Sequence, residues 1–406
     1  MSISKDTPTT SATSNRDATA PRYYFDHAAS APRRDEVADA MAPWQHGVVG
    51  NPSGSHRAAR EARRAIEEAR DEVAAFVGAE PGGVIFTAGG TESCDLAIVG
   101  VTNHHRRHHE TTSIVVSSVE HHAVLDAARM MERDFASVRL RYVAVDGDGV
   151  VDLDDLHEAL SPDTAIVSVM AANNETGVRQ PLDAVSSITN AVIPGGTVLH
   201  TDAVAAAPWL YLPMVTATMD MISICAHKIG GPVSSGALIL RNRVALDAVV
   251  PGGGQERGLR GGTVDVAAAV GLAAAVRATA RELTEVCDRV IDFQNKLFAA
   301  LCFLPGVEIT APGADRLPGT VHVTFKGLAS DELLFLLDQA GVFASAAASC
   351  SSGAEQASHV LAAMGMDPER ARGSLRLSMG PETTESDVDA LIAILSSVVY
   401  RLRAEA

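Results

Sequence analysis

The sequence predicts an α/β fold: a large, mostly parallel sheet domain flanked by helices, followed by a smaller α+β domain. Three observations lead to this prediction. Between residues 83 and 240, short apolar runs alternate with helical stretches, which is typical of a parallel sheet. Polar residues recur directly after these runs. In the last third, the run VHVTFKG and two helical segments indicate a separate unit.

Length, composition and charge narrow the class of protein. The 406 residues, 47% of them hydrophobic, suffice for two or three units with large cores. A net charge of −17 disfavours direct binding of nucleic acid or an anionic membrane surface, so small molecules and proteins are the expected partners. No apolar run approaches transmembrane length, and the N-terminus lacks a signal peptide's apolar core.

We divide the chain into three parts. Residues 1–20, rich in Ser, Thr and Ala, are expected to be a disordered tail, with a transit peptide as the weaker alternative. Residues 21–263 form the large domain. Residues 264–406 form the small domain, which an Ala-rich helix at 264–301 connects to the first.

The large domain begins near Tyr23 with a short segment that leads to an amphipathic stretch at residues 35–41. Turn-forming residues at 50–54 then precede a charged helix at 56–77. Glu and Arg alternate there at a spacing of four, which indicates a solvated face.

Residues 83–100 combine an apolar strand, a Gly-Gly turn and a helix. Backbone N–H groups at Gly90, the positive end of the helix and the hydroxyl of Thr91 suit a phosphate. A strand–turn–helix junction without a ligand is an equally common arrangement. The segment matches neither the ATP-binding nor the dinucleotide-binding glycine pattern, so those ligands are not favoured.

Polar side chains follow three of the next strands: His121, Asn174 and Asp202. Parallel strands present their carboxyl ends at one edge, where α/β enzymes keep their chemistry. A buried Asp202 needs a cationic partner, such as a protonated heteroaromatic nitrogen. His121 would lie over an aromatic cofactor or, alternatively, be an ordinary capping residue.

The stretch from 219 to 231 carries an apolar strand directly into His227, Lys228 and a glycine pair. At the mouth of a buried sheet, desolvation favours the uncharged, nucleophilic amine that an imine-forming lysine needs. A surface lysine is the alternative reading of this stretch alone.

Histidine and cysteine complete the candidates. The His-rich run at 104–110 is interpreted as a solvated connection, so no metal site is predicted. The five cysteines are widely spread and lack a C-x-x-C spacing, which favours reduced thiols and a cytoplasmic location. Cys350 lies in a stretch at 344–358 without large apolar residues, which predicts a mobile loop with a reactive thiol.

Taken together, these motifs resemble those of the cysteine desulfurases, pyridoxal-phosphate enzymes of fold type I in the class-V aminotransferase group. The resemblance runs from about Tyr23 to about Glu385. Its most specific segments are TES at 91–93, EHHAVLD at 120–126, NNETG at 173–177, HTDA at 200–203, HK at 227–228, GGGQERGLRGGT at 252–263, and the Cys350 loop followed by SHVLAAMG.

The resemblance implies a role for each matching residue. Lys228 would form the imine with pyridoxal 5'-phosphate, Asp202 would pair with its ring nitrogen, and His121 would stack on the ring. The implied cofactor-binding set is Gly90, Thr91, His121, Asn174, Asp202, Cys225, His227, Lys228 and, from the other subunit of a homodimer, Thr263. Asn51 and Arg376 would contact the carboxylate of the substrate, and Arg376 is suited to bidentate binding.

The implied reaction converts L-cysteine to L-alanine. Lys228 would remove the Cα proton, and the thiolate of Cys350 would attack the substrate sulfur and keep it as a persulfide for an acceptor protein. The catalytic residues implied are therefore Lys228, Cys350 and His121.

Three departures from the family pattern concern the shell around the cofactor. Ala205 stands where a glutamine is usual, and Cys225 and Ala226 replace the usual Ser and Gly. The pattern TESDN becomes TESCD, which puts Cys94 and Asp95 in polar positions. A specialised or slower desulfurase is consistent with these changes.

Two alternatives remain open. One is another fold-type-I activity, a cysteine or selenocysteine lyase or an aminotransferase, that does not need Cys350. The other is a catalytically silent scaffold for sulfur transfer, against which the joint retention of Lys228, Asp202 and Cys350 argues. The sequence does not name the sulfur acceptor or decide between cysteine, selenocysteine and a modified cysteine.

Overall fold

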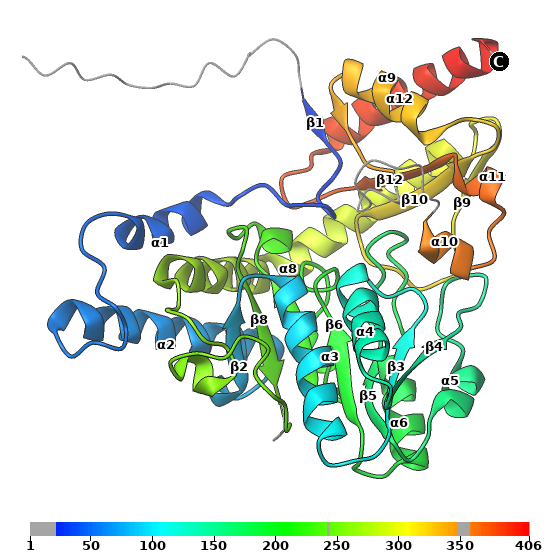
Figure 1. The fold of residues 1–406 in the computed structure, drawn as a ribbon. Coiled ribbons are helices and arrows are strands. Elements are labelled where there is room, and N and C mark those ends of the chain that lie inside the picture. The colour runs from blue at the N-terminus through cyan, green and yellow to red at the C-terminus, as the bar shows by residue number, and fades with distance from the viewer. Residues whose placement is uncertain (1–21, 242–243, 347–357, 406) are drawn as a thin grey trace, which may run out of the picture.

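The structure, a computed structural model, describes residues 22–241, 244–346 and 358–405. The tail predicted at residues 1–20 lies outside these ranges. Figure 1 shows a larger part built on one sheet and a smaller part that contains the C-terminus. No helix within the described ranges is long and apolar enough to cross a membrane.

The large sheet has seven strands in the order β2-β8-β7-β6-β5-β3-β4. Their bounds are β2 Val84–Thr87, β3 Thr112–Ser117, β4 Val138–Val143, β5 Thr164–Ser168, β6 Val198–Asp202, β7 Met221–Cys225 and β8 Gly236–Leu240. Only β8 runs antiparallel to its two neighbours within this sheet. The predicted mostly parallel sheet is therefore confirmed.

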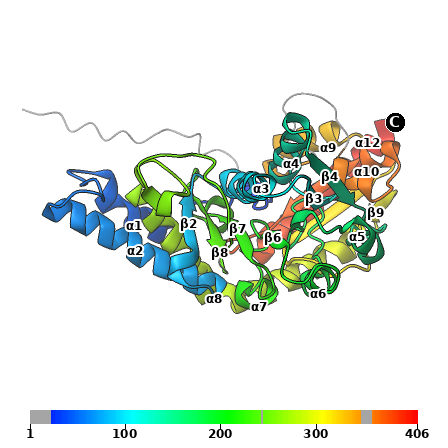
Figure 2. The same ribbon diagram turned by 60° about the horizontal axis from the view of Figure 1, so that its bottom comes forward.

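Alternate side chains of the strands enter two different cores. In β2, Val84 and Phe86 pack with one set of helices and Ile85 packs with the other. The helices on the Ile85 side are α3 Gly90–Arg106 and α4 His122–Asp134. Those of the other core are α1 Asp35–Gln45, α2 Arg57–Val77, α5 Leu153–Ala159, α6 Leu182–Val192, α7 Leu212–Val215 and the first part of α8 Val266–Leu301. Figure 2 shows the sheet between these layers.

The smaller part contains an antiparallel sheet in the order β12-β10-β9. Its strands are β9 Val307–Ile309, β10 Thr320–Phe325 and β12 Ser374–Ser378. Its helices are α9 Ser330–Gln339, α10 His359–Ala363, α11 Pro368–Ala371 and α12 Glu385–Glu405. Short 3-10 turns are η1 Pro81–Gly83, η2 His227–Ile229 and η3 Gln255–Gly258.

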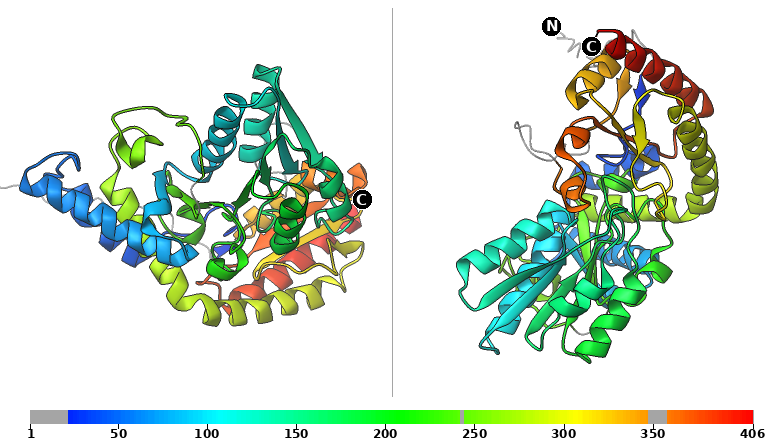
Figure 3. Two further views of the ribbon diagram at one scale, coloured as in Figure 1. Left: turned by 90° about the horizontal axis from the view of Figure 1, so that it is seen from below. Right: turned by 90° about the vertical axis from the view of Figure 1, so that its right-hand side faces the viewer.

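Two segments cross the division at residue 263 that the sequence indicated. The strand β1 Tyr23–Tyr24 pairs with β11 Val342–Phe343, and Phe25 joins the core of the smaller part, so these residues do not belong with the large sheet. Helix α8 has 36 residues and is therefore about 54 Å long, which is long enough to pack against the cores of both parts. Its first part packs under the large sheet and its last part under the small one, as Figure 3 shows.

The His-rich run also differs from the expected connection. His104, His105 and Arg106 form the last turn of α3. The ring of His105 stacks on that of His109, with centroids 3.9 Å apart, and its Nδ1 lies 2.9 Å from the hydroxyl of Thr112. Within the described residues, no group of three His, Cys, Asp or Glu side chains is arranged to hold a metal.

Candidate active site

The N-terminus of α3 forms one end of the candidate site. The residue before this helix, Gly89, has no side chain to cap it and has a φ of 137°. A Cβ on Gly90 would lie 2.9 Å from Cγ2 of Val204, and one on Gly236 would lie 2.8 Å from the backbone of Gly89. Glycine at 90 and 236 thus lets the turn lie close to the ends of β6 and β8, while Thr91 stays exposed.

Beside this turn, Cys225 ends strand β7 and His227 begins the turn η2. Nε2 of His227 lies 3.9 Å from the sulfur of Cys225. Burial, and then the nearby Lys228, lower the pKa of His227 to about 4, so the ring is neutral at physiological pH and can donate one N–H. Burial raises the pKa of Cys225 to about 12, which keeps it a thiol.

Asp202 is the last residue of β6 and is only 6% exposed. Its Oδ1 accepts a hydrogen bond from the N–H of Val204 at 2.9 Å. Burial raises the pKa of Asp202, and the neighbouring His121, the N–H of Val204, the thiol of Cys94 and Lys228 oppose this rise. A carboxyl in such surroundings favours a cationic partner.

His121 caps the N-terminus of α4: its Nδ1 accepts from the N–H of Ala123 at 3.1 Å. The structure therefore confirms the capping role that was one of the two readings of His121. Burial lowers the pKa of His121, with Asp202 acting in the opposite direction. Since Nδ1 accepts, the neutral ring carries its hydrogen on Nε2.

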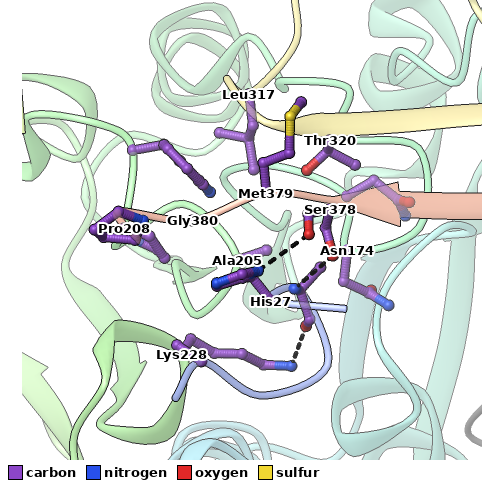
Figure 4. A pocket seen from close by; sticks show the side chains of 15 residues that line it. His27, Asn174, Ala205, Pro208, Lys228, Leu317, Thr320, Ser378, Met379 and Gly380 are labelled. Carbon is purple, nitrogen blue, oxygen red and sulfur yellow. Dashed lines mark hydrogen bonds between the residues drawn. The ribbon is translucent and has the colours of Figure 1, made fainter. Parts of the chain in front are cut away.

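Lys228 lies in η2, directly after β7, and Gly230 ends that turn with a φ of 74°. Its Nζ donates to the carbonyl oxygens of Ala28 and Ala29 at 2.5 and 2.9 Å. The side chain borders a mostly apolar pocket of about 470 Å³ between the two parts of the molecule. Figure 4 shows Asn174 and Ala205 lining the same pocket.

Arg376 lies beside this pocket, on β12. Its Nη1 donates to the carbonyl oxygen of Asn174 at 3.0 Å, and its Nη2 donates to Oδ1 of Asp26 at 2.9 Å. Within the described residues its Nε has no hydrogen-bond partner. The guanidinium is therefore close to the site and is paired with a carboxylate of the same chain.

The structure does not bring every predicted residue to Lys228. Asn51 and Thr263 are exposed and together border a different pocket of about 580 Å³. Cys350 lies outside the described residues. Cys94, expected in a polar position, is fully buried in the core under α3, and Asp95 is half-buried.

Three residues near Lys228 were missed from the sequence: His27, Ser378 and Glu382. Nδ1 of His27 lies 3.1 Å from the carbonyl oxygen of Ser378, and its Nε2 lies 3.4 Å from Oε2 of Glu382. The only signal in the sequence was the polar pair Asp26-His27 after a short apolar segment.

The donor set fits one kind of group. The uncapped helix start and His227 suit a phosphate, Asp202 suits a protonated ring nitrogen, His121 offers a ring face, and Lys228 offers an amine for an aldehyde. These features lie together because the carboxyl ends of β3, β6 and β7 meet at one edge of the sheet.

Comparison with known proteins identifies the family of the chain. The family model described as Aminotransferase class-V matches residues 23–391. An IscS-like cysteine desulfurase of Mycobacterium tuberculosis is 42% identical over 94% of this chain and 97% of its own, and cysteine desulfurase IscS 1 of Archaeoglobus fulgidus is 36% identical over 94% and 97%.

Solved structures agree. A NifS-like protein superposes with a TM-score of 0.86 at 32% identity, covering 94% of this chain and all of that one. A structure titled SspA in complex with cysteine has a TM-score of 0.77 at 30% identity, covering 89% and 100%. The chain therefore belongs to the class-V aminotransferase family and, within it, to the cysteine desulfurases.

Proposed function

We propose that the protein is a pyridoxal-phosphate-dependent cysteine desulfurase, which converts L-cysteine to L-alanine and passes the sulfur to an acceptor protein. The observation that carries this proposal is the meeting of Lys228, Asp202 and the uncapped start of α3 at one edge of the sheet, in a chain of this family.

The chain's own groups have distinct tasks in this proposal. Pyridoxal phosphate, when bound, supplies an electron sink for the bond changes at the substrate carbons. Asp202 would balance the positive ring nitrogen of the cofactor, and neutral His227, with Gly90 and Thr91, would hold its phosphate. Lys228 accepts the Cα proton of the substrate at Nζ.

Substrate binding uses Arg376, whose planar fork matches a carboxylate. Asp26 and the carbonyl oxygen of Asn174 fix the guanidinium while donors remain for the substrate. The proposed protein is a homodimer in which Thr263 contacts the phosphate of the partner's site. Asn51 borders the same pocket as Thr263, so in the homodimer Asn51 would also reach the site of the partner subunit.

Sulfur transfer is assigned to Cys350. Its thiolate attacks the substrate sulfur, an S–S bond forms as the C–S bond breaks, and the electron pair of the C–S bond stays on the carbon that becomes the methyl group of alanine. The protein keeps the sulfur as a persulfide. We further propose a cytoplasmic location; Cys94, Cys225, Cys287 and Cys302 are unpaired thiols, which is consistent with reducing surroundings.

The visible spectrum before and after addition of cysteine, with alanine measured as the product, tests this function. We expect a cofactor band that cysteine alters and one alanine for each sulfur transferred. A protein reconstituted with pyridoxal phosphate that neither changes its spectrum nor forms alanine would be a scaffold instead.

The variant Cys350→Ser separates the desulfurase from a lyase or an aminotransferase. We expect it to keep cofactor and cysteine binding and to lose persulfide formation. Wild-type turnover in this variant would favour a reaction that does not need Cys350. The matched control is Cys302→Ser, which changes an exposed cysteine and should leave persulfide formation intact.

A further inference from the structure

The ammonium of Lys228 is held by a segment about 200 residues away in sequence. Nζ donates to the carbonyl oxygens of Ala28 and Ala29 at 2.5 and 2.9 Å. Figure 4 shows the side chain of Lys228 pointing along the pocket toward this backbone, with one of the two contacts drawn. Carbonyl oxygens only accept hydrogen bonds, so they stabilise the amine in its charged form.

This segment is fixed to the end of strand β12. The N–H of Ala28 donates to Oγ of Ser378 at 2.9 Å, and the N–H of Ser378 donates to the carbonyl oxygen of Phe25 at 2.8 Å. Nδ1 of His27 lies 3.1 Å from the carbonyl oxygen of Ser378 and must be its donor. Ser378 therefore contacts the segment through its N–H, its carbonyl and its hydroxyl.

The ring of His27 lies in a space that Gly380 leaves open. A Cβ on Gly380 would lie 2.0 Å from Cδ2 of His27, which no packing tolerates. On the other side, Nε2 of His27 lies 3.4 Å from Oε2 of Glu382. The ring is 7% exposed, so three contacts determine where it lies and, with it, where the next two carbonyl groups lie.

We propose that the carbonyl oxygens of Ala28 and Ala29 are a cradle that receives the amine of Lys228 when a substrate amine replaces it on the cofactor, and that His27 and Ser378 are the positioning residues of this cradle. The inference rests on the proposed function. With pyridoxal phosphate bound, the C=N bond to Nζ would break as the substrate nitrogen takes its place, and Nζ would leave as an ammonium with the hydrogens that the substrate nitrogen gives up. Lys228 would then release one proton to solvent before it accepts the Cα proton.

The cradle determines how far this exchange proceeds. Hydrogen bonds to a charged group stabilise it more than those to a neutral one, so the cradle favours the state in which Lys228 has been displaced. Ser378 is two residues from Arg376 on the same strand and therefore on the same face of it. The strand that would bind the substrate carboxylate thus also fixes the lysine cradle.

Spectral titration of the cofactor-loaded protein with L-alanine tests the proposal, because alanine exchanges with Lys228 and has no sulfur to transfer. Ser378→Ala and His27→Gln should each raise the apparent Kd for alanine about tenfold. Their Kd for pyridoxal phosphate without an amino acid should stay within about twofold of wild type. Ser374→Ala is the matched control, since Ser374 is 4% exposed on the same strand and Ser378 is 2% exposed.

Each outcome decides one question. An unchanged Kd for alanine in a folded variant, by circular dichroism, that keeps the cofactor on Lys228 overturns the cradle. An equal weakening of alanine and cofactor binding also overturns it, since it shows a general structural role. If borohydride does not fix the cofactor on Lys228 in the wild type, the proposed function fails instead. If Ser378→Ala does not fold, the alanine titration of His27→Gln decides the question. If circular dichroism shows that both variants have lost their structure, Ser378 and His27 are needed for folding and the cradle is overturned.

Discussion

The guanidinium of Arg376 donates to Oδ1 of Asp26 at 2.9 Å, across 350 residues of sequence. Arg376 is 4% exposed, so its charge needs this carboxylate close by. A second donor goes to the carbonyl oxygen of Asn174 at 3.0 Å. These contacts orient the group without using all of its five N–H donors, which leaves it able to bind a substrate carboxylate.

Arg376→Lys should raise KM for cysteine about 10- to 100-fold, with a smaller effect on kcat. A lysine ammonium cannot satisfy Asp26, Asn174 and a substrate carboxylate in the planar geometry that arginine offers. Steady-state kinetics measure the effect. Arg370→Lys is the control, because Arg370 pairs with Glu308 and is only partly buried. Equal KM values in the two variants would remove Arg376 from the substrate site.

Glu175 should make stability depend on pH. It is 5% exposed, and burial raises its pKa to about 7, against the lowering effects of the Ser358 hydroxyl and of Arg376. Between pH 4.5 and about 7, the folded state keeps a proton that the unfolded state has released. The contribution of Glu175 to the free energy of unfolding therefore falls as pH rises through this window.

Glu175→Gln removes this titration and keeps an acceptor for Ser358, whose Oγ donates to Oε2 of Glu175 at 2.5 Å. Relative to wild type, the variant should gain up to about 3 kcal/mol between pH 4.5 and pH 7.5. Urea unfolding at the two pH values measures the difference. Glu332→Gln, at an exposed position of α9, should show no such gain. A pH-independent difference for Glu175→Gln would contradict the raised pKa.

Cys225→Ser should tighten retention of the cofactor about threefold to tenfold. The buried thiol of Cys225 is a weak donor, whereas a hydroxyl would form a stronger hydrogen bond to a phosphate. The dissociation constant of pyridoxal phosphate, from fluorescence titration of the apo-protein, measures the change. Cys287→Ser, beside the carbonyl oxygen of Trp209, is the control. Weaker binding in Cys225→Ser would place the phosphate elsewhere.

The sequence predicts the part of the site that follows from local pattern. Asp202 ends one buried strand and Lys228 follows shortly after another, and parallel strands bring their carboxyl ends to one edge. The glycine turn before α3 is likewise visible as a strand–turn–helix junction. These features need no knowledge of contacts between distant segments.

Contacts across the fold were not predictable in this way. His27 and Ser378 meet across 351 residues, because a two-residue strand pairs with the small part of the molecule. Nothing in the local sequence specifies that pairing. Cys94 was expected in a polar position, but the face of α3 that meets the sheet buries it completely.

The role of Lys228 is the central claim, and the composition of the chain makes it simple to test. The chain has four lysines: Lys5, Lys228, Lys296 and Lys326. Lys296 is paired with Glu385 and Asp389 on the surface. Reduction of the cofactor-loaded protein with borohydride, followed by peptide mass spectrometry, should place the pyridoxyl group on Lys228 and leave the other three lysines unmodified. A pyridoxyl group on another lysine, or on none, would contradict the account.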